Sequence, residues 1–288
     1  MAGLIQILAS GLLLGGLYAL AAFGLSIVWG VLNILNIAHG EFLMLGALVA
    51  YGIYALQGIN PFLIVLIIIP IFLLFSLLFE KILIRPMRGE TETEALVASI
   101  LVTLGGALII EDVTAFLWGK SFTGIPYSMG SIHMGEVVIP TLRLLILGFI
   151  LVLTLLIHFY LKRSYTGMAI RAITQNRTGA DIIGVNTIRI SMITFVIGTS
   201  LAAIAGVFYV VLYSMNPYMG LPLSVKYMCI VILGGLGSLI GSFAGGLILG
   251  VTEGLVGYYL SPDWSPTVAY FALVTILLVR PQGLFGRR

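Results

Sequence analysis

Long apolar runs separated by short polar stretches dominate this chain. The runs cover residues 4–29, 34–56, 62–84, 95–118, 142–161, 190–213, 239–259 and 266–279, with a shorter run at 225–233. A run of about 20 apolar residues can cross a bilayer as a helix, and continuous rather than alternating hydrophobicity argues against a β-barrel. The pattern predicts an all-α polytopic membrane protein with about eight transmembrane helices, one of them in a broken, Gly-rich segment.

The composition fits this class. Hydrophobic residues make up 60% of the 288 and charged residues 9%, whereas a soluble domain has about 45–50% and about 25%. We therefore expect one transmembrane domain over residues 1–288. The first run lacks a preceding basic region, so it predicts a span and not a cleaved signal peptide. The single cysteine, Cys229, allows no disulfide framework within one chain.

The most polar stretch, residues 162–189, separates two apolar runs and predicts a docking loop for a cytosolic partner. It holds five basic side chains and one acid. Ser164 and Thr166 precede an expected helix at 167–174, and Asn176 and Thr178 precede a shorter one at 179–183, where they would act as caps. Gly184 would end the second helix in a left-handed conformation.

Lysine and arginine are distributed unevenly between the two sides of the predicted bundle. The loops after the third and fifth spans, together with the C-terminal tail, carry 11 of the 14. Since basic loops stay in the cytosol, the N-terminus is predicted outside and the C-terminus in the cytosol. This topology requires residues 234–238 to form a turn on the cytosolic side.

Four polar residues cluster where the second span begins. Asn33, Asn36 and His39 are each three apart and would share one helix face with Glu41 nearby. Polar groups inside spans usually face a cavity or a partner, so one interpretation is a cluster that lines the translocation path. The alternative is a helix cap combined with a buried His–Glu hydrogen bond that pins two spans together.

The Gly-rich segment near the C-terminus is the second candidate part of a path. Gly234, Gly235 and Gly237 interrupt an apolar run, and Glu253 follows within the next one. A carboxylate at the bilayer centre costs about 2.5–3.5 kcal/mol, so we expect Glu253 to face the bundle interior. Interruptions at 29–36 and 234–246 also indicate a possible inverted repeat.

Sequence motifs for catalysis are missing from the chain. It contains no GxxxxGK[ST] phosphate loop, no HExxH, no nucleophile elbow and no Cys/His constellation. We therefore expect neither an enzyme nor a metal site, and nothing in the sequence indicates nucleic-acid binding.

Four motifs, in order, resemble the permeases of bacterial branched-chain amino acid ABC importers. They are NILNIAHGEFLMLG at 33–46, GMAIRAITQN at 167–176 followed by Ala180 and Gly184-Val-Asn186, VILGGLGSLIG at 231–241, and RPQGLFG at 280–286. The similarity covers essentially the whole chain. The short N-terminus and the His-Gly-Glu sequence are similar to the smaller of the two permeases that pair in one importer.

The resemblance implies a multi-pass permease subunit in a bacterial or archaeal inner membrane. It would move a small polar solute, foremost branched-chain or other hydrophobic amino acids, delivered by an extracytoplasmic binding protein. A second permease (the same or a similar chain), membrane lipid and a cytosolic ATPase that holds ATP and Mg would be its partners. The residues implied in ATPase coupling are Arg171, Asn176, Arg177, Thr178, Ala180, Asp181, Ile182, Ile183 and Gly184.

Two other functions stay open at this point. Urea or short amides are alternative solutes, because the family includes permeases for them. A stand-alone channel or secondary transporter would instead use His39, Glu41 and Glu253 as ion-coupling groups. Uptake by the chain alone, driven by an ion gradient, would favour the second function.

Overall fold

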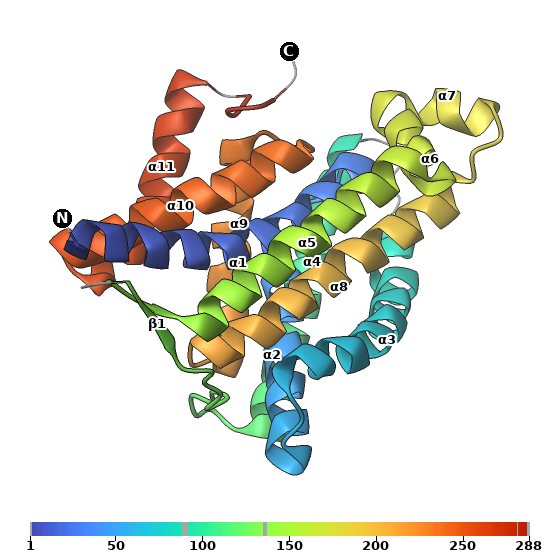
Figure 1. Cartoon of the computed structure of the whole chain (residues 1–288). Helices are drawn as coiled ribbons and strands as arrows, with labels where there is room; N and C mark the ends of the chain where they lie inside the picture. The colour runs from blue at the N-terminus through green and yellow to red at the C-terminus, as the bar shows by residue number, and fades with distance from the viewer. Residues whose placement is uncertain (1, 88–91, 135–136, 281, 287–288) are drawn as a thin grey trace.

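The computed structural model describes the whole chain except residues 1, 88–91, 135–136, 281 and 287–288 (Figure 1). Its helices are α1 (Ala2–Leu32), α2 (His39–Gln57), α3 (Pro61–Phe79), α4 (Glu92–Trp118), α5 (Thr141–Arg163), α6 (Tyr165–Gln175), α7 (Arg177–Ile182), α8 (Thr187–Leu212), α9 (Gly220–Gly234), α10 (Leu239–Tyr259) and α11 (Ser265–Val279). Two short strands, β1 (Ser131–Met134) and β2 (Val137–Pro140), form an antiparallel hairpin.

Eight helical segments in the described part of the chain are long and apolar enough to cross a membrane, and α11 is a shorter apolar helix. The prediction of an all-α polytopic membrane protein is therefore confirmed. Large apolar side chains are exposed along α3, α4 and α5, among them Leu66, Leu101 and Leu156. In a membrane these surfaces face lipid or a partner and need no polar cover.

Glycines bring α1 into backbone contact with α10, which runs antiparallel to it. A Cβ atom added to Gly15 would lie 2.8 Å from the Cα of Leu247, and one added to Gly250 would lie 2.3 Å from the Cα of Gly15. A side chain does not fit at these separations. Small residues are what allow helix backbones to approach this closely in lipid, where van der Waals contact largely replaces the hydrophobic drive between helices.

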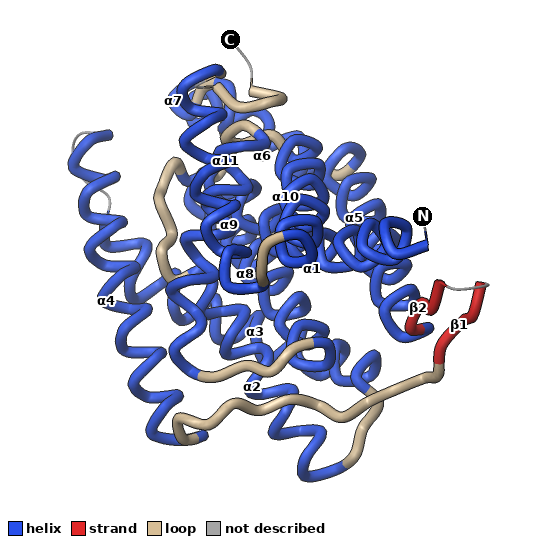
Figure 2. Tube along the Cα trace, turned by 90° about the vertical axis from the view of Figure 1, so that its left-hand side faces the viewer, coloured by secondary structure: helices blue, strands red, loops and turns tan. Residues whose placement is uncertain are grey.

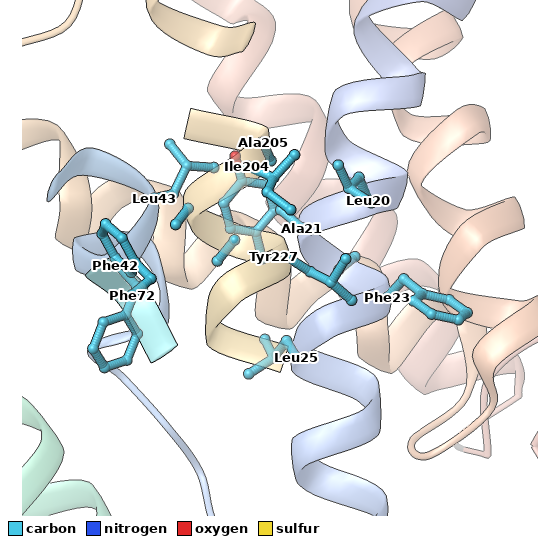
Figure 3. Packing of buried hydrophobic residues seen from close by; sticks show 14 of the residues in the cluster. Leu20, Ala21, Phe23, Leu25, Phe42, Leu43, Phe72, Ile204, Ala205 and Tyr227 are labelled. Carbon is cyan, nitrogen blue, oxygen red and sulfur yellow. The ribbon is translucent and has the colours of Figure 1, made fainter. Parts of the chain in front are cut away.

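Glycines also allow α8 to pack closely against α1 and α2. A Cβ on Gly24 of α1 would lie 2.4 Å from the carbonyl oxygen of Gly198, and one on Gly206 of α8 would lie 2.0 Å from that of Leu43. Aromatic rings then fill the space beside α2, where the Phe42 ring centroid lies 5.0 Å from that of Phe79. Figure 3 shows this core around Leu43 and Tyr227.

Residues 33–38 are not helical, so the prediction that the second helix begins at residue 34 was wrong. The chain leaves α1 at Leu32 and reaches α2 only at His39. The Nε2 atom of His39 lies 2.9 Å from the carbonyl oxygen of Ala21. Ala21 is 11 residues before the end of α1, which corresponds to about 16 Å of helix. The non-helical segment 33–38 therefore runs back into the bundle beside α4 (Figure 2).

Hydroxyl groups of α4 satisfy part of the backbone of segment 33–38. The amide of Leu35 donates to Oγ of Ser99 (3.2 Å), and the amide of Ile37 donates to Oγ1 of Thr103 (3.1 Å). Without these hydroxyls the two amides would be unsatisfied in apolar surroundings, at a cost of about 1–3 kcal/mol each. Irregular backbone at membrane depth is tolerated only with partners of this kind.

The second interruption is shorter than predicted, and α9 is longer. Helix α9 begins at Gly220, not near residue 225, so it is not the short half-helix that the sequence suggested. Its end at Gly234 is followed by Gly235 and Gly237, with φ of 103° and 75°, which non-glycine residues rarely adopt. The C-terminal tail covers this end, because the amide of Leu284 donates to the carbonyl of Leu233 (2.8 Å).

Contacts between distant segments agree with the predicted sides of the membrane. The side-chain amide of Gln6, near the N-terminus, bonds both backbone groups of Val138 in the hairpin, at 2.6 and 2.9 Å. At the other end of α1, a Cβ on Gly30 would lie 3.5 Å from the Cα of Gly237 and 3.7 Å from the side chain of Thr174 in α6. The turn at 234–238 thus lies on the same side as the docking loop.

We predict that the contact between α1 and α10 tolerates no side chain at its centre. Gly250→Leu should lower the thermal stability of the purified protein, because overpacking costs about 1–3 kcal/mol. Gly148→Leu on α5 is the matched control, since nothing lies within 4 Å of a Cβ there. Equal melting temperatures for the two variants in detergent would contradict this account of the packing.

Candidate functional site

The structure separates the four polar residues that begin the second span. Asn33 is exposed and has φ of 52°, the only positive φ of a non-glycine residue in the described chain. Asn36 is buried in segment 33–38, and only His39 and Glu41 belong to a helix. The prediction of one shared helix face was wrong, because the helix that would create that face does not form until His39.

His39 pins α2 to α1 and does not pair with Glu41. Its Nε2 donates to the carbonyl of Ala21, and its ring meets that of Tyr227 edge to face, with centroids 6.4 Å apart. Its Nδ1 has no hydrogen-bond partner among the described residues. The alternative interpretation was therefore right that the histidine joins two spans and wrong about the partner.

Glu41 is fully buried against the beginning of α9. A Cβ added to Gly220 would lie 2.2 Å from the Glu41 carboxyl group, so the carboxyl group rests on the first residue of that helix. The amide of the adjacent Gly40 donates to Oγ of Ser224 (2.7 Å). Neither carboxyl oxygen of Glu41 has a hydrogen-bond partner among the described residues, so the contact with α9 is one of packing. Glu41 thus joins the start of α2 to the start of α9.

Glu253 faces the bundle interior, as predicted, and lies in an ion pair. Its side chain is 2% exposed, and its Oε1 atom lies 3.0 Å from Nζ of Lys226. The hydroxyl of Tyr18 donates to Oε2 (2.8 Å), and Lys226 Nζ also lies 4.8 Å from the centre of the Tyr18 ring. The group joins α1, α9 and α10. Sequence reasoning missed Lys226, one of the three basic residues outside the cytosolic loops and tail, because it was considered only in the charge balance.

The two interruptions of the helices meet at a small pocket. Gly235 and Gly237 turn the chain after α9, while segment 33–38 follows α1, and both border the same space. The pocket has a free volume of about 20 Å³. Its lining residues are Leu25, Trp29, Leu35, Asn36, Met228, Val231, Ile232 and Leu236. Two segments separated by about 200 residues in sequence thus line one cavity, which neither motif revealed alone.

Gly234 is needed for packing within the second interruption. A Cβ at this position would lie 2.3 Å from the carbonyl oxygen of Gly241, in the first turn of α10. The glycine therefore allows α9 and α10 to meet closely at the turn. Its predicted place in the translocation path, like that of Gly235 and Gly237, stays a prediction.

The docking loop folds as two short helices, α6 and α7, and some of the predicted caps form. Ser164 caps α6 by accepting from the amide of Gly167 (3.0 Å), and Asn176 caps α7 by accepting from that of Gly179 (2.8 Å). Gly184 has φ of 87°, as predicted for the residue that ends the second helix. Thr166 caps no helix in the structure; its hydroxyl accepts from that of Tyr160 instead.

The side chains of the docking loop divide into a buried base and an exposed surface. Ala180 is buried, so the prediction that it presents a surface to a partner was wrong. Arg171 donates to the carbonyl of Leu161 at the end of α5 and holds α6 against that helix. Ile182 and Ile183 are 80% and 74% exposed. Asn176, Arg177, Thr178, Asp181 and Gly184 are exposed as well.

Over nearly its whole length the chain is similar to known transport proteins. The family model described as "Branched-chain amino acid transport system / permease component" matches residues 7–277. The high-affinity branched-chain amino acid permease protein LivH of Salmonella typhimurium is 32% identical over 98% of this chain and 96% of its own. BraD of Pseudomonas aeruginosa, named as the same kind of permease, is 30% identical over 98% and 96%. A probable LivH of Methanocaldococcus jannaschii is 24% identical over 98% and 92%.

We predict that the pair of Lys226 and Glu253 stabilises the junction of α1, α9 and α10. Glu253→Gln should lower the melting temperature, because removing one partner of a buried pair costs about 3–5 kcal/mol. The double variant Lys226→Met/Glu253→Leu should recover most of that loss, since it leaves no unpaired charge. A double variant as unstable as the single one would contradict this role.

Proposed function

This chain belongs to the family of branched-chain amino acid transport permeases, and we propose that it is the membrane-spanning subunit of an ATP-driven importer for branched-chain amino acids. The observation that carries the proposal is similarity at 30–32% identity, over nearly the full length, to permeases named for that transport. The eight candidate spans fit a multi-pass membrane protein. The inner membrane of a bacterium or archaeon is the proposed location.

Other solutes are less well supported by these similarities. Permeases named for autoinducer 2 import match only part of this chain, 73% at 29% identity for that of an Enterobacter strain. The branched-chain permeases match 98%. Urea or short amides stay an alternative that direct transport measurements must decide. Family membership also favours an importer subunit over a stand-alone ion-coupled transporter.

The exposed surface of α7 is the proposed docking site for a cytosolic ATPase, which would hold the ATP and Mg. Ile182 and Ile183 expose large apolar side chains beyond the membrane spans, and such patches on soluble surfaces mark interaction sites. Arg177 and Asp181 lie exposed beside them and offer charges for pairing. Ala180, buried beneath, would support the helix instead of touching the partner.

The other proposed partners are assigned to the two remaining kinds of surface. The hairpin β1–β2 lies on the side opposite α6 and α7, where an extracytoplasmic binding protein would deliver the solute. A second permease, identical or similar, would cover part of the exposed apolar surface, and lipid would cover the rest.

The proposed translocation path follows the non-helical segment 33–38. Asn33 and Asn36 belong to that segment, and His39 and Glu41 lie at its inner end, deep in the bundle. Leu236, between Gly235 and Gly237 in the other interruption, lines the pocket together with Leu35 and Asn36. We keep Gly234, Gly235 and Gly237 as proposed path residues for that reason. Glu253 does not line this pocket and forms an ion pair with Lys226 of α9. Its proposed contribution is therefore indirect: it holds α9, which borders the path, in position.

We predict that α7 transmits ATPase motion through its two exposed isoleucines. Ile182→Ser/Ile183→Ser should reduce co-purification of co-expressed ATPase subunits and ATP-driven uptake at least about tenfold, since a few central apolar residues dominate binding at interfaces. The melting temperature of the permease should not change, because both side chains face solvent.

Ile188→Ser, at the start of α8, is the matched control, with an isoleucine 40% exposed outside the proposed surface. Normal co-purification and normal uptake in the double variant would show that the ATPase docks elsewhere. Loss of both activities in Ile188→Ser as well would indicate a general effect of removing apolar surface.

A further inference from the structure

Residues 282–286 of the C-terminal tail supply the end of α9 with hydrogen-bond donors. A helix leaves its last four carbonyl groups without partners of its own. In α9 the carbonyl of Leu233 accepts from the amide of Leu284 (2.8 Å), and that of Gly234 accepts from the amide of Phe285 (3.0 Å). This tail segment, residues 282–286, therefore completes the end of a helix that is distant from it in sequence.

Glycines let the tail segment lie directly against the backbone of the turn after α9. Gly283 is buried and has φ of 79°. A Cβ atom added to it would lie 2.5 Å from both the amide nitrogen of Gly235 and the carbonyl oxygen of Ile232. A Cβ added to Gly235 would lie 2.5 Å from the amide nitrogen of Gly286. A side chain at either glycine would therefore push the tail segment away from the turn.

The turn after α9 is held at both of its glycines with positive φ. Gly235 contacts the tail segment, and the Cα of Gly237 lies 3.5 Å from a Cβ placed on Gly30 at the end of α1. Between the two, Leu236 lines the pocket that it shares with segment 33–38. The tail segment and α1 thus determine together where this wall of the pocket lies.

Helix α9 depends on this support because one of its faces is open. Val225 is 41% exposed, and Met228 and Ile232 continue the face toward the turn as partly exposed residues. Lys226 anchors the first half of the helix through its ion pair. Residues 228–234 carry no charged side chain that could form a second one, so the end of α9 is fixed by packing and by its hydrogen bonds to the tail segment.

We propose that the tail segment is a positioning element of transport: it holds the turn after α9, so that motion of the docking loop moves α9 and the pocket wall. The Cγ2 atom of Thr174 in α6 lies 3.7 Å from the same added Cβ of Gly30 that approaches Gly237. With the tail segment in place, the turn cannot yield at this meeting point without breaking hydrogen bonds. With it detached, the turn yields and ATP is hydrolysed without moving solute. This inference rests on the proposed function and adds a coupling element outside the docking loop.

Gly283→Ala tests the contact, because its added methyl group meets the backbone of the turn. Gly119→Ala is the matched control, since Gly119 has φ of 78° and nothing lies within 4 Å of its added Cβ. Both variants carry the strain of an alanine with positive φ, and only Gly283→Ala also displaces the tail segment. Leu284→Ala and Phe285→Ala keep both amide donors and remove only exposed side chains.

The first measurement follows the single cysteine of the chain. Cys229 of α9 is 3% exposed, so its thiol group reacts with a small reagent only when the helix opens locally. Gly283→Ala should raise this rate in the purified permease about tenfold, as expected from the loss of about two hydrogen bonds, and the controls should react like the wild type. An unchanged rate would show that the tail segment does not hold α9, whatever the permease transports.

The second measurement is the number of leucine molecules moved per ATP hydrolysed by the complete importer, reconstituted with its ATPase and binding protein. Gly283→Ala should lower this ratio at least about fivefold, the lower end of typical coupling between sites, while ATPase co-purification and ATP hydrolysis persist. Gly119→Ala, Leu284→Ala and Phe285→Ala should keep the ratio of the wild type.

The outcomes separate this inference from the proposed function. A faster reaction of Cys229 with an unchanged ratio in Gly283→Ala would overturn the inference and leave the proposed function intact. An equal fall of the ratio in Phe285→Ala would assign the effect to a side chain and overturn it as well. A wild-type importer that does not carry leucine would overturn the proposed function and this inference with it. If Gly283→Ala does not assemble, Phe285→Pro, which removes the amide donor to Gly234, decides against Phe285→Ala.

Discussion

A chain that leaves helical geometry inside an apolar bundle must satisfy its backbone from its neighbours, and segment 33–38 imposes this constraint on the structure around it. Helix α4 supplies two hydrogen-bond acceptors: the hydroxyl groups of Ser99 and Thr103 accept from the backbone amides of Leu35 and Ile37. The start of α2 is then held deep in the bundle, where His39 bonds α1 and Glu41 meets the start of α9. The irregular segment is thus fixed in place, and an open face of α9 lies beside it.

The helices around this segment form a rigid support because their backbones touch. Contacts at Gly15 and Gly250 leave no room for α1 and α10 to repack, and the pair of Lys226 and Glu253 ties α9 to both. In contrast, the turn after α9 meets the end of α1 at Gly30, close to Thr174 of α6. The docking loop therefore meets the two interruptions at this point, and motion of the proposed ATPase would reach the pocket through this contact.

The sequence predicted the features that depend on composition and local chemistry. Apolar runs predicted the spans, and Ser164, Asn176 and Gly184 predicted the ends of α6 and α7. The uneven charges predicted that the docking loop and the turn after α9 share one side, and both meet the same end of α1. The failures concern features set by distant partners. Segment 33–38 is apolar enough for a helix, and the hydroxyls of α4 that satisfy two amides of its non-helical form lie more than 60 residues away. Ala180 was misplaced because a small apolar residue in a short helix suits a buried base as well as an exposed surface.

If segment 33–38 lines the path of the solute, a thiol group in place of Leu35 must be reachable from water, and chemical labelling measures this. A cysteine would replace Leu35 in a background with Cys229→Ser, within the reconstituted importer, and its reaction with a small charged thiol reagent would be followed. We expect reaction at a rate that changes when ATP is trapped and falls when leucine is supplied, because only a water-filled path admits the reagent. A cysteine at Leu101, on the exposed apolar face of α4, should stay unreactive. Equal rates at the two positions in every state would show that segment 33–38 does not line the path.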